Sequence, residues 1–214
     1  MLTYWYYFFG LAALLLMGFV AWRLASRRET WPCPAWLGWL VELDNPLFKN
    51  NSAHAIVQHL DLQPGMKVLD LGCGPGRLTI PVARQVGPQG EVVAVDIQAG
   101  MLQRTQKKAQ AANLNNIRYV QAGAGEGKLA RGEYGRALLV TVLGEIPDRT
   151  TALKEVFDAL KTGGILSVTE VIVDPHFQRR STVREFACAV GFKERECFGN
   201  RLAFTMNLEK PVEP

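Results

Sequence analysis

The sequence predicts an α/β protein: a doubly wound, mostly parallel sheet with helices on both faces, preceded by a hydrophobic N-terminal helix. Three observations predict this architecture. Apolar strand-like runs alternate with amphipathic helical runs between residues 67 and 190, which is typical of parallel sheets covered by helices. Glycines stand at positions 72, 74 and 76, directly after the first strand-like run. A long run near the N-terminus carries no charged side chain.

The uncharged run extends from Tyr4 to Trp22 and contains 19 residues. As a helix it would be about 28 Å long, close to the thickness of a bilayer core. Arg23, Arg27 and Arg28 follow it, and the positive-inside rule then predicts a single-pass transmembrane helix with the following domain in the cytoplasm. A signal peptide fits less well, because the first three residues carry no positive charge. The remaining alternative is a hydrophobic helix that is docked on protein.

Residues 1–28 are therefore assigned to a membrane anchor and its basic flank, and residues 29–50 to a second, tryptophan-rich segment. That segment contains Trp31, Trp36 and Trp39, and Pro32 and Pro34 separate it from the anchor. A short helix is expected after the prolines. It either covers the following domain or lies in the lipid headgroup layer, which would make the bilayer a partner of the protein.

The remaining residues, 51–214, are expected to form one domain. Asn51 or Ser52 caps a helix that runs to about Leu60, because these side chains accept hydrogen bonds from the first free amides of a helix. A turn containing Pro64 and Gly65 leads into the first strand. Strands and helices are then expected in alternation at 67–71, 77–86, 91–97, 99–113 and 117–121.

The second half of the domain continues this alternation after a glycine-rich loop. A strand is expected at 136–143, and Asp148 caps a helix that Gly163-Gly164 should end. A strand at 165–173, a helix at 177–190 and strands at 192–198 and 202–209 complete the domain. The last two strands are joined by Gly199-Asn200, which predicts a hairpin and one antiparallel strand in a sheet of seven.

The domain is organised around residues 68–76, VLDLGCGPG, which read as a strand, a tight turn and a helix N-terminus. Glycines let backbone N–H groups approach a ligand, and the helix dipole adds partial positive charge. Asp70 ends the strand, where a carboxylate can receive an ammonium group. Asp96, at the end of the next strand, is placed to accept hydrogen bonds from both ribose hydroxyls of a nucleoside. A nicotinamide-binding G-x-G-x-x-G pattern would need glycine where Arg77 stands.

The run D-L-G-C-G-P-G resembles motif I of the class I S-adenosylmethionine-dependent methyltransferases, and the likeness covers roughly residues 51–210. It implies a Rossmann-like sheet of seven strands with a C-terminal antiparallel hairpin, and S-adenosyl-L-methionine as cofactor. Without an inserted substrate domain, the chain is similar to small quinone and phospholipid methyltransferases. The resemblance implies that Gly72, Cys73, Gly74 and Gly76 line the methionine part of the cofactor.

The resemblance also suggests where the nucleoside lies. Asp96 resembles the ribose-binding acid of the family, and Ile97 would pack on the adenine. An acid after the third strand often binds the adenine amino group, but this sequence has Gly123 there, followed by Ala124. Backbone groups of Gly123 and Ala124, or the carboxylate of Glu126, would have to serve instead.

Glu145 and His176 are the candidate catalytic residues. Glu145 lies in the loop after the fourth strand, where the family places residues that face the reactive methyl group. His176 follows the fifth strand, and an unperturbed histidine titrates near neutrality, so it is suited to take a proton from an acceptor. The alternative for Glu145 is a surface carboxylate or a charge at the start of a helix, and the alternative for His176 is a polar surface histidine.

Composition narrows the remaining function classes. A net charge of +4 is too small to indicate a nucleic acid partner, and the four cysteines form no C-x-x-C pair or metal-ligand cluster. We therefore expect a methyltransferase, without a metal, that acts on a lipophilic or membrane-resident acceptor: a lipid headgroup amine, a quinol or a small thiol. The alternatives are a tethered enzyme with a soluble small-molecule acceptor and a non-catalytic cofactor-binding scaffold. The oligomeric state stays open.

Overall fold

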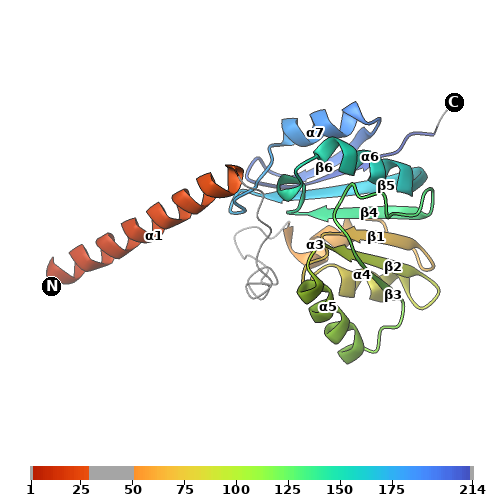
Figure 1. Cartoon of the computed structure of the whole chain (residues 1–214), viewed down its shortest axis with the longest axis horizontal. Coiled ribbons are helices and arrows are strands. Elements are labelled where there is room, and N and C mark those ends of the chain that lie inside the picture. Colours follow the sequence, from red (N-terminus) through yellow and green to blue (C-terminus); the bar gives the residue numbers. More distant parts are fainter. Residues whose placement is uncertain (1, 29–50, 213–214) are drawn as a thin grey trace.

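The computed structural model of the chain describes residues 2–28 and 51–212. Seven strands form one sheet in the order β3-β2-β1-β4-β5-β7-β6 (Figure 1). All neighbours are parallel except β7, which runs antiparallel to both β5 and β6. The strands are β1 (Lys67–Leu71), β2 (Glu91–Asp96), β3 (Ile117–Gln121), β4 (Tyr134–Val140), β5 (Leu160–Val171), β6 (Lys193–Gly199) and β7 (Ala203–Glu209).

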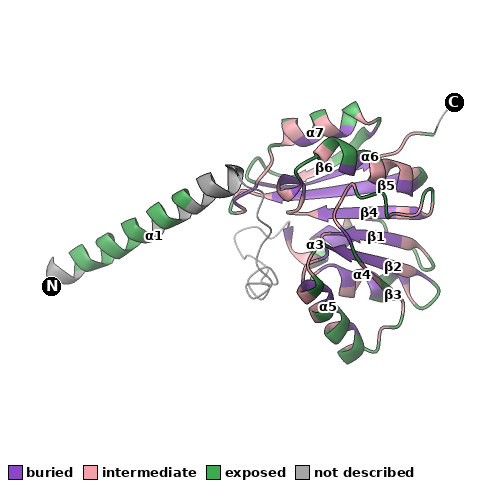
Figure 2. Cartoon of the chain, viewed as in Figure 1, coloured by how far each residue is buried: buried purple, intermediate pink, exposed green. Residues whose placement is uncertain are grey.

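Helices cover both faces of this sheet. Successive residues of a strand point to opposite faces, so Val68 and Leu69 of β1 belong to two different apolar clusters. The cluster of Val68 includes residues of α3 and α4, and that of Leu69 includes residues of α6 and α7. Figure 2 shows the inner strands of the sheet buried between the two helical layers, whereas the edge strands β3 and β6 contain no fully buried residue. The helices are α1 (Leu2–Arg28), α3 (Ala53–Gln58), α4 (Thr79–Val86), α5 (Ala99–Ala111), α6 (Arg149–Ala159) and α7 (Arg180–Ala189), with a short 3₁₀ helix, η3 (Leu143–Glu145).

The predicted seven-stranded α/β sheet with its closing hairpin is confirmed. The predicted helix start at Ser52 is also confirmed, because its side chain accepts a hydrogen bond from the Ala55 amide. One prediction is wrong: α6 ends at Ala159, and β5 runs through Gly163-Gly164. Gly163 has φ +73° and donates its N–H to the carbonyl of Lys210. These glycines therefore lie in an irregular start of a strand and do not end a helix.

Helix α1 extends away from the sheet domain (Figure 1) and includes the predicted span Tyr4–Trp22. Its side chains at Trp5, Tyr6 and Tyr7 are exposed. Among the residues whose side chains are described, no helix has the length and apolarity needed to cross a bilayer. The predicted helix is thus present, but its assignment as a membrane span is not borne out. Tyrosine hydroxyls and an indole N–H make these residues less apolar than aliphatic ones.

The tryptophan-rich segment predicted at 29–50 lies outside the described residues. The predicted domain start at residue 51 adjoins the sheet directly. Asn51 is buried and its side-chain amide donates to the carbonyl of Phe204 in β7. Asn207, also in β7, donates to the carbonyl of His59. The first helix of the domain is therefore attached to its last strand.

Candidate functional site

The glycine turn after β1 forms a backbone surface at the carboxyl end of the sheet. Gly72, Gly74 and Gly76 all have positive φ angles, which L side chains rarely adopt. The amides of Gly72 and Cys73 donate to the Val95 carbonyl of β2 at 2.8 and 3.0 Å. A Cβ atom built on Gly74 would meet nothing within 4 Å. The turn is thus fixed from beneath by β2, and its Gly74 face is open to a ligand.

Asp96 lies beside this turn at the end of β2. One of its carboxylate oxygens accepts the Gly74 N–H at 2.9 Å, and the other accepts the Gln98 N–H at 2.8 Å. Burial raises the pKa of Asp96, and these two amide donors oppose that shift. Each oxygen has a further lone pair for a ribose hydroxyl. Ile97 follows with its side chain 57% exposed, as a flat base stacked on it would require.

Two threonines that the sequence analysis missed support the turn from the helices. Thr79, at the start of α4, donates its hydroxyl to Asp70 at 2.6 Å. Thr105 of α5 donates to the Gly74 carbonyl at 2.9 Å, and its Cγ2 atom would lie only 2.8 Å from a Cβ built on Gly76. Both threonines fall inside helical patterns, so their spacing gave no signal of a site.

Asp70 and Cys73 lie deeper than Asp96. Burial raises the pKa of the Cys73 thiol well above its ordinary value, so this thiol is not an activated nucleophile. The pKa of Asp70 is raised to about 6, mainly by burial and in smaller part by the nearby Asp96 carboxylate. The Thr79 hydroxyl opposes this shift. A cation bound above the turn would favour the ionised form of Asp70.

This carboxyl group predicts a pH dependence of cofactor affinity. Below pH 6 the free protein holds Asp70 protonated, so a cationic sulfonium ligand must displace that proton and binds more weakly. We expect the affinity for S-adenosylmethionine to fall by up to about tenfold per pH unit below pH 6. Titration calorimetry between pH 5 and pH 8 measures it. Asp70→Asn should give a flat profile, and a wild-type profile that is flat to pH 5 contradicts the prediction.

In the loop after β3, the Glu126 carboxylate lies close to position 123, where the family often has an acid. The Glu126 carboxylate turns back toward Gly123: a Cβ built on Gly123 would lie 2.8 Å from Glu126 Oε1. Lys128, 2.9 Å away, and the Gly123 amide lower the pKa of Glu126. Gly123 and Ala124 are adjacent to β2 at this point, since the Ala122 amide donates to the Asp96 carbonyl.

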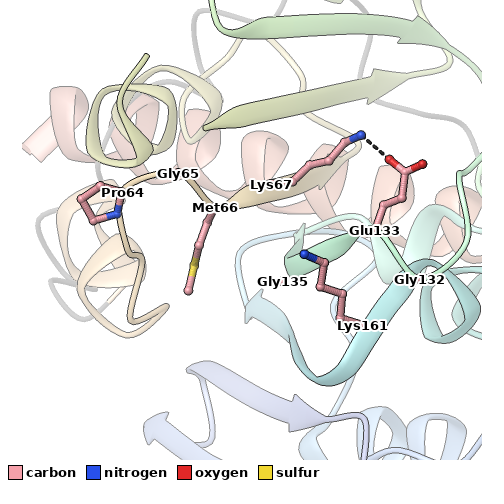
Figure 3. Close-up of a pocket in the computed structure, with 8 residues that line it drawn as sticks. All are labelled: Pro64, Gly65, Met66, Lys67, Gly132, Glu133, Gly135 and Lys161. Carbon is pink, nitrogen blue, oxygen red and sulfur yellow. Dashed lines mark hydrogen bonds and ion pairs between the residues drawn. The ribbon is translucent and has the colours of Figure 1, made fainter. Parts of the chain in front are cut away.

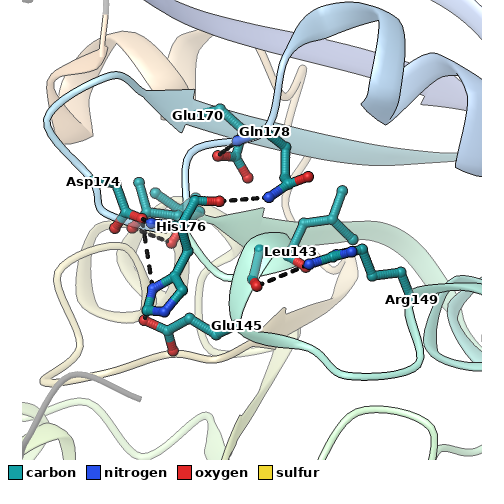
Figure 4. A network of polar contacts seen from close by, with 10 residues as sticks. Leu143, Glu145, Arg149, Glu170, Asp174, His176 and Gln178 are labelled. Carbon is teal, nitrogen blue, oxygen red and sulfur yellow. Dashed lines mark hydrogen bonds and ion pairs between the residues drawn. The ribbon is translucent and has the colours of Figure 1, made fainter. Parts of the chain in front are cut away.

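Glu145 and His176 come together at the carboxyl ends of β4 and β5 (Figure 4). His176 is buried, and its Nδ1 lies 3.8 Å from Glu145 Oε1 and 3.9 Å from Asp174 Oδ1. Asp174 Oδ1 also accepts the His176 backbone N–H at 2.7 Å. The surface alternative for His176 is therefore wrong, because the imidazole is enclosed between two acidic side chains.

Two further residues, Arg149 and Asp174, hold the loops that carry this pair, and a third, Glu170, lies buried near them. Arg149 of α6 donates to the carbonyls of Leu143 and Gly144 at 3.0 and 3.1 Å and so holds η3. Asp174 precedes His176 by two residues, and this spacing, typical of an Asx turn, was a signal that the sequence analysis did not use. Glu170 is buried at the end of β5, and nothing in the sequence pattern distinguishes it from a strand residue.

A separate hollow of about 530 Å³ lies at the amino ends of the strands, where β1 and β4 begin (Figure 3). Lys67 lines this hollow and forms ion pairs with both Glu91 and Glu133. These two carboxylates offset the positive charge that Lys67 could otherwise offer to a ligand. In the described part of the chain no group of three or more His, Cys, Asp or Glu side chains is placed to hold a metal ion.

A glycine turn after β1, an acid ending β2 and a seven-stranded sheet with β7 antiparallel define a nucleoside-binding methyltransferase fold. The chain belongs to the family described as "Methyltransferase domain", whose model matches residues 62–200. S-adenosylmethionine is the cofactor. The open face of Gly74 leaves room for the cofactor against the backbone of the turn, and the Asp96 carboxylate can accept hydrogen bonds from its ribose. The predicted family and cofactor are confirmed.

Curated relatives are quinone-pathway enzymes. The chain is 31% identical over 110 residues to the demethylmenaquinone methyltransferase of Geobacillus stearothermophilus, covering 51% of this chain and 47% of that protein. It is 38% identical over 117 residues to the ubiquinone/menaquinone biosynthesis C-methyltransferase UbiE of Vibrio campbellii, covering 53% of this chain and 45% of that protein. The chain therefore spans about half the length of these relatives.

A solved SAM-dependent methyltransferase from Aquifex aeolicus has the same fold. Its TM-score is 0.74 at 17% identity, and the match covers 84% of this chain and 100% of that one. At this identity the likeness establishes the fold alone.

Proposed function

We propose that this protein transfers a methyl group from S-adenosylmethionine to a lipophilic acceptor, a quinol-type ring in particular. The observation that carries the proposal is the Glu145–His176 pair, whose Oε1 and Nδ1 atoms are 3.8 Å apart. The pair lies at the carboxyl ends of the strands, as do the glycine turn and Asp96. Methylation of a hydroxylated ring removes a proton from the acceptor, and this pair is suited to receive it. The names of the curated relatives favour the same acceptor class.

The protein's contribution is mainly alignment and proton removal. The cofactor supplies an activated methyl group on a sulfonium. The open face of the glycine turn and Asp96 would hold it in one orientation, and such positioning contributes up to roughly 7–11 kcal/mol in well-aligned reactions. His176 would take the proton from the acceptor, and Glu145 and Asp174 would stabilise the resulting imidazolium by their negative charge.

Replacement of either member of the pair tests the proton-transfer role. His176→Gln and Glu145→Gln should each lower kcat by about 100-fold, the usual lower range for loss of general acid–base catalysis. Binding of S-adenosylhomocysteine should stay within twofold of wild type, because neither residue lies at the glycine turn. His54→Gln, at an exposed histidine of α3, is the matched control. An unchanged kcat in both variants rejects the assignment.

The acceptor class is tested directly with the full-length protein. Incubation with labelled S-adenosylmethionine and reduced demethylmenaquinone should give a labelled lipid-extractable product. Label found only in water-soluble small molecules supports the second candidate, a tethered enzyme with a soluble acceptor. Cofactor binding measured by calorimetry, without turnover over both acceptor sets, supports the third candidate, a non-catalytic scaffold.

We further propose that α1 holds the protein at a membrane, with the methyltransferase domain on the cytoplasmic side. Five consecutive aromatic side chains on α1, Trp5 to Phe9, are each more than half exposed, and an uncovered apolar surface of this kind usually meets lipid or another protein. Fractionation of cells that produce the full chain or a variant lacking residues 1–28 tests the location. Recovery of both forms in the soluble fraction contradicts it.

A further inference from the structure

Glu170 is a buried acid that the proposed reaction leaves unexplained. It lies near the end of β5, opposite Phe204 of β7, and is only 1% exposed. Its Oε2 accepts the backbone N–H of Gln178 at 2.9 Å. Its Oε1 is fully buried and has no hydrogen-bond partner among the described residues. A carboxyl group is thus enclosed directly beneath the loop that follows β5.

A continuous set of hydrogen bonds leads from Glu170 to His176 (Figure 4). Gln178, whose backbone is held by Glu170, donates its side-chain amide to the His176 carbonyl at 2.6 Å. The His176 amide in turn donates to Asp174. Hydrogen bonds therefore hold both the amide and the carbonyl of His176. They fix the position of its backbone, and so the position from which its imidazole side chain extends.

The loop is also packed against the other catalytic loop. A Cβ built on Gly144 would lie 1.9 Å from the His176 carbonyl oxygen, so the two backbones are in close contact. A shift of residues 174–178 would therefore change the separation between His176 and Glu145, which lies next to Gly144.

The charges around Glu170 favour its neutral form. The pKa of Glu170 is raised to about 8, mainly by burial and in smaller part by the carboxylates of Asp174 and Glu145. The Gln178 amide and the guanidinium of Arg149 on α6 oppose this shift. Ionisation would add a third negative charge beside Asp174 and Glu145, with one oxygen lacking a donor.

We propose that Glu170 is a positioning residue whose neutral carboxyl group holds the loop 172–178, and with it His176, in place for proton transfer. Ionisation strengthens the bond that Oε2 accepts from Gln178, but it also leaves a charge buried in the protein with no donor at Oε1. Opening of the loop lets water reach this charge, so we expect the loop to open more often, and catalysis to weaken, at alkaline pH, whichever acceptor the protein methylates. The catalytic consequence rests on the proposed function, whereas the effect on the loop does not.

Hydrogen exchange of the loop amides tests the effect on the loop without any substrate. After correction for intrinsic base catalysis, protection of the His176 and Gln178 amides in the full-length protein should fall by about tenfold between pH 7 and pH 9, because ionisation of one group changes an equilibrium by up to tenfold per pH unit. In Glu170→Gln, which keeps the size and the acceptor oxygen but cannot ionise, protection should stay level. A level wild-type profile, or the same fall in the variant, overturns the proposal.

Two further variants separate positioning from general instability. Glu155→Gln is the matched control, because Glu155 holds another loop through the Gly125 and Leu129 amides; it should keep the wild-type fall at residues 176–178. Gln178→Ala, which removes the contact with the His176 carbonyl, should lower protection of His176 at every pH. If Glu170→Gln fails to fold, the hydrogen-exchange profiles of wild type and of Gln178→Ala still test the positioning role.

The pH profile of methyl transfer then connects the loop to the reaction. In wild type, kcat should fall with an apparent pKa near 8 while KM for S-adenosylmethionine stays constant, and Glu170→Gln should lack this fall. An absent fall in wild-type kcat, with active enzyme, removes the catalytic part of the proposal. If no quinol is methylated but the exchange results hold, the proposed acceptor is wrong and the positioning role stands.

Discussion

Replacement of Asp96 by alanine is expected to abolish cofactor binding at physiological concentrations. Asp96 bridges the Gly74 and Gln98 amides, and in the bound state it would also accept both ribose hydroxyls. Hydrogen bonds to charged groups contribute about 1.5–3 kcal/mol each, so loss of two should raise the dissociation constant of S-adenosylhomocysteine by about 100-fold or more. Titration calorimetry measures this constant directly, without an acceptor.

The control for Asp96→Ala is Asp158→Ala. The Asp158 carboxylate is partly exposed on α6 and, within the described part of the chain, its ion pair is with Lys154. Surface pairs contribute little, and the affinity of Asp158→Ala should equal that of wild type. A change of less than fivefold in Asp96→Ala, with the fold intact by circular dichroism, would mean that the nucleoside does not lie at the end of β2.

Gly144→Ala is expected to lower both stability and catalysis without touching the cofactor. The new Cβ would lie 1.9 Å from the His176 carbonyl oxygen and 2.8 Å from its carbonyl carbon. Backbone cannot move aside as a flexible side chain does, so the two loops must separate. Overpacking costs about 1–3 kcal/mol, and a loss near the upper limit lowers the Tm of a domain of this size by roughly 6–12 °C. We expect kcat to fall at least tenfold, since small misplacements of catalytic groups are costly.

Gly135→Ala provides a matched control for this glycine. A Cβ there would make only ordinary contacts, 3.9 Å from Met66 and 4.0 Å from the Lys67 carbonyl. Its Tm should stay equal or rise slightly, because alanine restricts the unfolded chain. Thermal denaturation, S-adenosylhomocysteine titration and a methyl-transfer assay should be run on both variants. Normal kcat in Gly144→Ala would show that the contact between the loops has no part in the reaction.

The sequence predicted best what depends on neighbouring residues. Strands β1 and β3 begin and end where their apolar runs do. The glycine turn and Asp96 were recognisable because their roles follow from short segments at the ends of strands. In both cases the local pattern and the final structure favour the same conformation.

Features that depend on distant contacts were missed. Gly163-Gly164 resembles a helix end, but pairing with residues 209 and 210 draws this segment into β5. Glu170 occupies a strand position whose burial depends on β7, more than thirty residues later. The approach of Gly144 to His176 likewise joins loops that follow different strands. A short segment of the sequence does not contain both members of any of these contacts, so a local pattern cannot predict them.

The order of strands in the sheet has a consequence for how the protein is made. β7 lies between β5 and β6, although it leaves the ribosome after both of them. While it is still inside the exit tunnel, β5 has an open edge and β6 has nothing to pair with. The nascent chain therefore cannot complete this sheet until residues 203–209 have left the tunnel, and a premature stop codon near residue 200 would yield a product that exposes an unpaired strand to aggregation.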